Sequence, residues 1–278
     1  MAKIYPLLGI PQPFDPTCRY TTSWLLPPFP LASLRLLLSV YAFATIFTVF
    51  GWDDAHHLAA AARQSFSYFT NLTYWGLAFY LLFGALHTFS YARTGQAWLR
   101  GWPRPLQAAH AVFYSTVVTF PFLVTLVFWA ILYRDPWFPV VEEGWSNISQ
   151  HALNSLFALV EVVLPRTSPP PPLHIVFLVI LLACYLALAY ITHATEGFYP
   201  YSFLDPSKGN GRVTGYCFGI LIAICVIFGI AWGVIWLRNL ATQKLGLEGK
   251  FVGQRRKADG LDVRERNVEV VELQEEPK

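Results

Sequence analysis

Long stretches of this chain carry no charged side chain at all. Residues 64–92, 106–133 and 213–237 are runs of 29, 28 and 25 residues without an Asp, Glu, Lys or Arg. A helix needs ~20 predominantly apolar residues to cross the hydrocarbon core of a bilayer. The sequence therefore predicts an all-α fold, in the form of a polytopic bundle of transmembrane helices.

The composition supports a membrane protein and argues against other classes. Only 13% of the 278 residues are charged, whereas soluble proteins carry about 25%. The net charge of +3 provides no broad basic surface for binding nucleic acid. The four cysteines lack zinc-type spacing and are interpreted as small, buried apolar residues. The chemistry considered below requires no metal or organic cofactor.

Six membrane spans are predicted. The fourth is the shortest and is interrupted by polar residues, so a five-span alternative, in which this segment is re-entrant or interfacial, stays open. The six spans run over residues 31–52, 68–91, 106–133, 148–164, 173–195 and 213–237.

The distribution of basic residues predicts the orientation. With six spans, both termini share one side of the membrane with 16 Lys or Arg residues, against four on the other side. The positive-inside rule places that side in the cytoplasm. The predicted organisation is a cytoplasmic segment 1–30, a bundle 31–238 and a charged, mostly disordered cytoplasmic tail 239–278. The endoplasmic reticulum and the plasma membrane both fit this organisation.

The fourth predicted span carries a polar stripe. His151, Asn154, Ser155 and Glu161 recur at helical spacing and share one face. The opposite face is apolar. The stripe is interpreted either as a hydrogen-bonded seam between helices or as part of a functional site, since polar groups are costly inside a bilayer.

Thr70 and Thr73 stand at the head of the second predicted span. Membrane threonines usually bond their own backbone four residues earlier. Alternatively, a neutral imidazole such as that of His151 can activate a threonine hydroxyl as a nucleophile. Glu161 lies ~15 Å along a helix from His151, too far to orient its ring, whereas Asn154 lies only ~4.5 Å away. Asn154 is therefore the better candidate for a polar neighbour or an oxyanion donor.

Two other groups of residues are weaker candidates. His193 and Tyr199 belong to a polar, aromatic cluster at the mouth of the fifth span, and this cluster could contribute to a site or to its entrance. Asp53 and His57 have the i, i+4 spacing of metal ligands. A hydrated loop outside the first span explains that pair equally well.

At these positions the sequence resembles the androgen-induced and androgen-dependent TFPI-regulating family of integral-membrane hydrolases. The resemblance covers roughly residues 66–235 and depends on the order and spacing of several short motifs. The matching residues are Phe69-Thr70, Phe120-Pro121, Val127-Phe128-Trp129, His151 with Phe157 and Leu159-Val160-Glu161, His193-Ala194-Thr195, and Tyr199-Pro200.

The resemblance implies an enzyme that cleaves fatty acid esters of hydroxy fatty acids, with Thr70 as the nucleophile and His151 as the base. Its substrate would enter from the bilayer. The chain departs from the family at Ile148, where a second histidine is frequent, and at Thr73, where an acid or amide is frequent. These departures leave the substrate open and keep Thr73 as a reserve nucleophile. A small transporter or channel, or a non-catalytic membrane scaffold, are the alternative functions.

Overall fold

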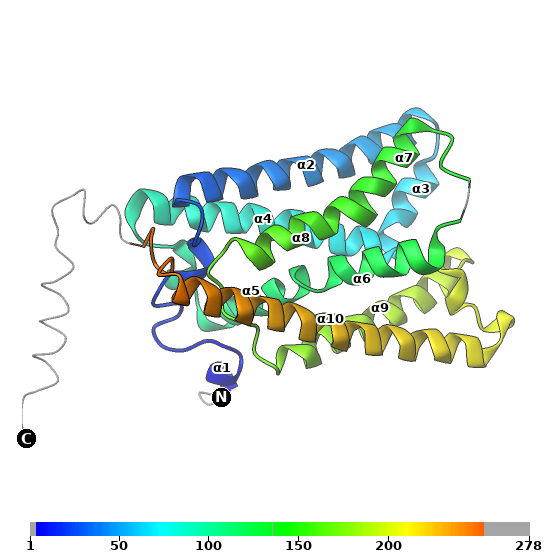
Figure 1. Cartoon of the computed structure of the whole chain (residues 1–278). Coiled ribbons are helices and arrows are strands. Elements are labelled where there is room, and N and C mark those ends of the chain that lie inside the picture. Colours follow the sequence, from blue (N-terminus) through cyan, green and yellow to red (C-terminus); the bar gives the residue numbers. More distant parts are fainter. Residues whose placement is uncertain (1–3, 135, 253–278) are drawn as a thin grey trace, which may run out of the picture.

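The computed structural model describes residues 4–134 and 136–252, which form long helices lying side by side (Figure 1). Within these ranges no β-strand forms, and an isolated antiparallel bridge joins Ser23 to Pro165. The all-α prediction is confirmed. The helices are α1 Ile4–Leu7, α2 Pro28–Ala55, α3 Ala59–Gln64, α4 Phe69–Thr94, α5 Arg104–Val117, α6 Phe120–Val127, α7 Val141–Ile148, α8 Asn154–Val163, α9 His174–Glu196 and α10 Asn210–Lys244.

In the described part of the chain, five helical stretches are long and apolar enough to cross a membrane. They are α2, α4, the stretch Arg104–Leu132, α9 and α10. The stretch Arg104–Leu132 comprises α5, α6 and a π-helical turn over Phe128–Leu132. The chain is therefore an integral, multi-pass membrane protein.

The fourth predicted span is helical but is not among the five stretches that are long and apolar enough to cross a membrane. α7, a π-helical turn over Ser149–Leu153, and α8 follow one another from residue 141 to residue 163. The stripe of polar side chains on this helix lowers its hydropathy. α8 nevertheless packs against α6 and α10 inside the bundle, and it runs beside α2 and α4 in Figure 1. The six predicted segments thus correspond to these five stretches and to one further helical segment, which carries the polar stripe.

The ends of α4 and α9 follow from their sequences. Each helix is followed by a glycine in the left-handed region, Gly95 at φ +72° and Gly197 at φ +80°. Their N–H groups donate to the carbonyls of Tyr91 and His193, at 2.8 and 3.0 Å. Glycine adopts this conformation without a steric penalty and ends helices for that reason. Gly197 begins the link to α10 that contributes to the site below.

The third predicted span is broken at residues 118–119, between α5 and α6. Pro121 follows the break, and proline removes a helical N–H donor and bends helices. Thr119 has a non-helical φ of −133°, and its hydroxyl donates to the Ser115 carbonyl at 2.6 Å. Beyond the break, the carbonyl of Pro121 accepts hydrogen bonds from α8.

A buried ion pair joins α2 to α8. Arg35 donates from Nε and Nη2 to the two carboxylate oxygens of Glu161, each at 2.7 Å, and both side chains are fully buried. The Arg35 Nη1 donates to Thr88 Oγ1 at 2.6 Å and to the Tyr20 carbonyl at 2.9 Å. A buried pair is tolerated when its hydrogen-bonding capacity is used in this way. Glu161 is thus engaged with α2, and Arg35 connects it to Thr88 of α4.

The two predicted terminal segments differ. Leu8, Ile10 and Phe14 are buried in a cluster that includes Tyr91 and Leu99, so the N-terminal segment is folded onto the bundle. Of the predicted tail 239–278, the first residues extend α10 to Lys244, and turns follow as far as residue 252. The rest of the predicted disordered tail lies outside the described residues.

Candidate functional site

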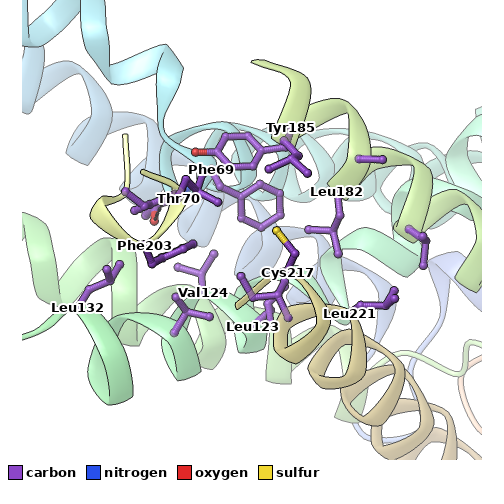
Figure 2. A pocket seen from close by; sticks show the side chains of 17 residues that line it. Phe69, Thr70, Leu123, Val124, Leu132, Leu182, Tyr185, Phe203, Cys217 and Leu221 are labelled. Atoms are coloured by element: carbon purple, nitrogen blue, oxygen red, sulfur yellow. Dashed lines mark hydrogen bonds between the residues drawn. The ribbon is translucent and has the colours of Figure 1, made fainter. Parts of the chain in front are cut away.

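An apolar cavity of about 250 Å³ lies between α4, α6, α9 and α10. Figure 2 shows Thr70 at one side of this cavity, with Leu182 and Leu221 farther along it. The hydroxyl-bearing lining residues are Thr70, Tyr185 and Tyr201, and Cys217 contributes a thiol. The remaining lining residues are hydrocarbon or phenyl groups. A cavity of this composition suits an alkyl chain that enters from the bilayer.

Thr70 is the second residue of α4. The first N–H groups of a helix have no partner within it. The Thr70 N–H donates instead to the Tyr201 hydroxyl at 3.4 Å, and Thr70 Oγ1 lies 3.5 Å from the same oxygen. Thr70 is only 8% exposed. A hydroxyl and a helix-terminal amide therefore meet at the wall of the cavity, where the helix dipole favours negative charge.

Residues before α4 fix the position of Thr70. The Tyr185 hydroxyl donates from α9 to the Ser67 carbonyl at 3.1 Å. Asn71 Nδ2 donates to the Ser65 carbonyl at 2.9 Å. Because these bonds hold the turn that precedes α4, the first turn of the helix is held against α9.

Thr73 has a different environment. Its hydroxyl donates to the carbonyls of Phe69 and Thr70, both at 3.0 Å. Thr73 also lines a second apolar cavity of about 420 Å³, on the other side of Phe69. Since the Thr73 hydroxyl is bonded to its own helix, Thr70 is the better placed of the two hydroxyls for attack.

His151 lies on the π-helical turn between α7 and α8. Its Nδ1 is 3.0 Å from the Asn147 carbonyl. A carbonyl only accepts, so Nδ1 carries the proton and Nε2 keeps a lone pair. The ring stacks on Phe128, with centroids 3.6 Å apart. π-Helical turns are often found at functional sites.

The structure does not bring Thr70 and His151 into direct contact. Among the described residues no hydrogen bond joins them, and His151 does not line the cavity that Thr70 lines. Phe128 lies between them. Its ring stacks on the imidazole of His151, and it directly follows Val127, which lines the apolar cavity. The two candidate residues therefore lie on neighbouring structural elements, and α4 contacts the π-helical turn of His151.

Asn154 and Ser155 join α8 to α6. Thr125 Oγ1 donates to Asn154 Oδ1 at 3.1 Å and lies 2.6 Å from Ser155 Oγ. Both side chains also donate to the Pro121 carbonyl, at 3.4 and 3.0 Å. These contacts form an interhelical seam of the kind expected between membrane helices.

The predicted cluster at the end of α9 lies outside the apolar cavity. His193 stacks on Tyr199 with ring centroids 3.9 Å apart. Both residues line a separate, more polar cavity of about 550 Å³, together with Asp205 and Lys208. The 197–209 link thus has two faces, because Tyr201 and Phe203 of the same link line the apolar cavity.

Tyr201 is the contact of Thr70 that sequence reasoning missed. Tyr199 was singled out instead, although the two tyrosines lie in the same aromatic stretch. Tyr199 lines the polar cavity, whereas Tyr201 lines the apolar cavity and contacts Thr70. Among the described residues there is no group of three or more His, Cys, Asp or Glu side chains able to hold a metal ion, at Asp53 and His57 or elsewhere.

The comparison with known families matches residues 34–233 to the model of the FAR-17a/AIG1-like proteins. The chain belongs to this family. The matched region includes Arg35, Thr70, His151, Glu161 and Tyr201, so the buried ion pair and the candidate site both lie within the FAR-17a/AIG1-like part of the chain. The searches of curated proteins and of solved structures gave no match.

Proposed function

We propose that this protein is a membrane-embedded lipid ester hydrolase that cleaves fatty acid esters of hydroxy fatty acids. The observation that carries the proposal is the position of Thr70. Its hydroxyl and its N–H stand at the wall of an apolar cavity between membrane helices. Membership of the FAR-17a/AIG1-like family is compatible with this activity.

In the proposed reaction an acyl chain lies along Leu182 and Leu221, with the ester carbonyl beside Thr70. Thr70 Oγ1 attacks the carbonyl carbon. Because Thr70 and His151 are not in contact, the proton passes through an intervening water molecule to Nε2 of His151, the ring nitrogen that the Asn147 bond leaves free. The ester C–O bond then breaks, the imidazolium proton goes to the departing alkoxide, and a hydroxy fatty acid leaves. Water then attacks the acyl-threonine while His151 takes the water proton. The bond between the acyl carbon and Thr70 Oγ1 breaks, the proton returns to Thr70, and the second fatty acid leaves.

The negative charge of the tetrahedral intermediate needs donors in the cavity. The Thr70 N–H and the Tyr201 hydroxyl are the two donors beside Thr70 Oγ1. Two such donors, fixed before the reaction, stabilise an oxyanion strongly in a site that excludes water. Asn154, the earlier candidate for this role, is bonded into the seam with α6. We therefore assign the oxyanion role to Tyr201 and the Thr70 amide.

The experiment compares purified wild type with Thr70→Ala, His151→Ala and Thr73→Ala in hydrolysis of a fatty acid ester of a hydroxy fatty acid. We expect Thr70→Ala to lose activity by about 10³-fold or more and His151→Ala by about 10²–10⁴-fold. Thr73→Ala is the matched control, since it removes a hydroxyl from the same helix. A fluorophosphonate probe is expected to label the wild type and not Thr70→Ala.

Three results would contradict the proposal. Full hydrolysis by Thr70→Ala and His151→Ala would remove both site assignments. Substrate flux in liposomes that is insensitive to Thr70→Ala would favour a transporter. If the wild type shows neither hydrolysis nor flux while His151→Ala lowers stability, the protein is a scaffold.

We further propose that both termini face the cytoplasm, in the endoplasmic reticulum or the plasma membrane. The proposal depends on the excess of basic residues beside the first and last spans. Accessibility of single added cysteines in the 56–58 and 206–209 links to a membrane-impermeant maleimide tests it. In sealed cells or vesicles of known orientation, labelling from the cytoplasmic side would contradict it.

A further inference from the structure

The two arginines Arg19 and Arg166 converge at the end of the bundle opposite to the α9–α10 link. There the end of α10 lies beside the N-terminal segment (Figure 1). Arg166 belongs to the link between α8 and α9, and Arg19 to the N-terminal segment. Both guanidinium groups bind Glu248, which follows α10. None of these residues takes part in the proposed hydrolysis.

The two guanidinium groups are held in place by the rest of the protein. The Arg166 side chain is only 5% exposed, and its Nη1 donates to Thr22 Oγ1 at 3.0 Å. Arg19 donates from Nη1 to the Arg166 carbonyl at 3.1 Å. We call the guanidinium groups of Arg19 and Arg166 the cradle. Because these bonds do not involve Glu248, the cradle is pre-organised for an anion. Pre-organisation lowers the entropic cost of binding.

Glu248 uses this cradle incompletely. Its Oε1 accepts from Arg166 Nη2 at 2.7 Å, from Arg166 Nε at 3.1 Å and from Arg19 Nη2 at 3.1 Å. Within residues 4–134 and 136–252, its Oε2 accepts from the Thr242 hydroxyl alone, at 3.5 Å. One carboxylate oxygen is therefore saturated, while the other is left with a single long contact.

The charges around the cradle do not balance. Arg238 is a third guanidinium at this end, and it donates to the carbonyls of Val162 and Thr167 and to the Asn239 side chain, none of them charged. Asp15 is a second carboxylate, whose oxygens accept from the N–H groups of Arg19 and Tyr20. The charge of Arg100 also acts on Asp15, so among the described residues at this end the arginines outnumber the two carboxylates and leave an excess of positive charge.

The segment that carries Glu248 is a short turn beyond α10. Gly246 and Gly249 have φ of +66° and +76°, and Leu245 is 70% exposed. The ion pairs that join this segment to the N-terminal segment and to the α8–α9 link are both made by Glu248. A stronger anion could therefore displace the carboxylate without disturbing the helices.

We propose that Arg19 and Arg166 form a binding site for a phosphate monoester, and that Glu248 occupies it as an internal competitor. A phosphate monoester carries about −1.5 to −2 charge at pH 7 and three acceptor oxygens. Two of its oxygens can accept hydrogen bonds from the paired N–H groups of Arg166, and the third can accept from Arg19. It also neutralises the excess positive charge that remains when the Glu248 carboxylate is bound. The monoester belongs to an anionic lipid headgroup or to a soluble phosphate.

The test uses Glu248→Gln, which removes the competing charge while keeping the side-chain shape. Binding to purified, delipidated protein is measured by calorimetry with inorganic phosphate, with a short-chain phosphatidic acid and with the matching phosphatidylcholine. We expect Glu248→Gln to bind phosphatidic acid, or phosphatidic acid and inorganic phosphate, about tenfold more tightly than wild type, and phosphatidylcholine no more tightly. A gain with phosphatidic acid alone assigns the site to a lipid headgroup, and a gain with both ligands assigns it to phosphate chemistry in general.

Two matched variants keep the proposal falsifiable. Glu196→Gln removes a glutamate from the exposed Arg63–Glu196 ion pair, 4.0 Å across, and is expected to bind as wild type does. The double variant Arg19→Gln with Glu248→Gln is expected to lose the gain. The proposal is wrong if Glu248→Gln binds phosphatidic acid no more tightly than wild type does, or if the double variant keeps the gain. A purely structural latch predicts that Glu248→Gln melts earlier and that no phosphate restores its melting temperature.

Discussion

Two polar regions inside the bundle are built in opposite ways. Around Arg35 and Glu161, two hydrogen bonds of 2.7 Å join fully buried side chains. The Thr88 hydroxyl and the Tyr20 carbonyl accept further hydrogen bonds from Arg35. Around Thr70, the contacts with Tyr201 are 3.4 and 3.5 Å long and open onto a cavity. A saturated polar group stabilises a fold, whereas a loosely bonded group beside a cavity is free to exchange its partner for a ligand. Hydrogen-bond saturation, more than burial, distinguishes the two.

Removing one member of the saturated pair should give the largest effect. We expect Glu161→Ala to lower the free energy of unfolding by about 3–5 kcal/mol, since it leaves the Arg35 charge buried without a partner. Thermal unfolding in detergent measures the loss. The double variant Arg35→Met with Glu161→Leu should recover most of it. If Glu161→Ala were as stable as wild type, the comparison between the two regions would fail.

Removing the hydroxyl of the loosely bonded region should affect activity more than stability. We expect Tyr201→Phe to reduce hydrolysis by about 10–100-fold, because one oxyanion donor is lost, and to change the unfolding free energy by less than about 1 kcal/mol. Steady-state hydrolysis and thermal unfolding of the same preparation separate the two effects. Tyr199→Phe is the control, since Tyr199 faces the polar cavity. A large loss of stability in Tyr201→Phe would place this hydroxyl with the structural groups.

The partly exposed ion pair of Glu248 should give the smallest effect and should depend on pH. Burial raises the pKa of Glu248, but the bonds from Arg166 and the charge of Arg19 outweigh it and hold the pKa below its ordinary value. The carboxylate therefore stabilises the fold above the ordinary pKa of glutamate, and this contribution is lost as the pH falls through the lowered pKa. We expect Glu248→Gln to be less stable than wild type by about 1 kcal/mol at pH 7.

The melting temperatures of wild type and Glu248→Gln, measured from pH 7 to pH 3, check this expectation. The difference should shrink only below about pH 4.3, the ordinary value for glutamate. The groups facing the carboxylate are the guanidinium groups of Arg19, Arg166 and Arg238 and the hydroxyl of Thr242. A difference that disappears between pH 7 and pH 6 would show that another group controls it.

The sequence by itself determined which segments are helices and where several of them end. Charge-free runs longer than ~20 residues leave little alternative to membrane helices, and Gly95 and Gly197 end α4 and α9 as their positive φ angles require. The stripe of His151, Asn154, Ser155 and Glu161 was also visible as a periodic pattern. Periodicity indicates which side chains share a face, because it follows from the geometry of one helix.

Only the tertiary structure decided which faces meet. Glu161 pairs with Arg35, which is 126 residues away in the chain. Thr70 meets Tyr201 across 131 residues, while Asn154 bonds to α6. These contacts depend on the rotation of each helix about its axis and on the bend at Pro121, to which helices far apart in the sequence all contribute. A local pattern does not contain that information, because a rotation of one helix changes its partners without changing its periodicity.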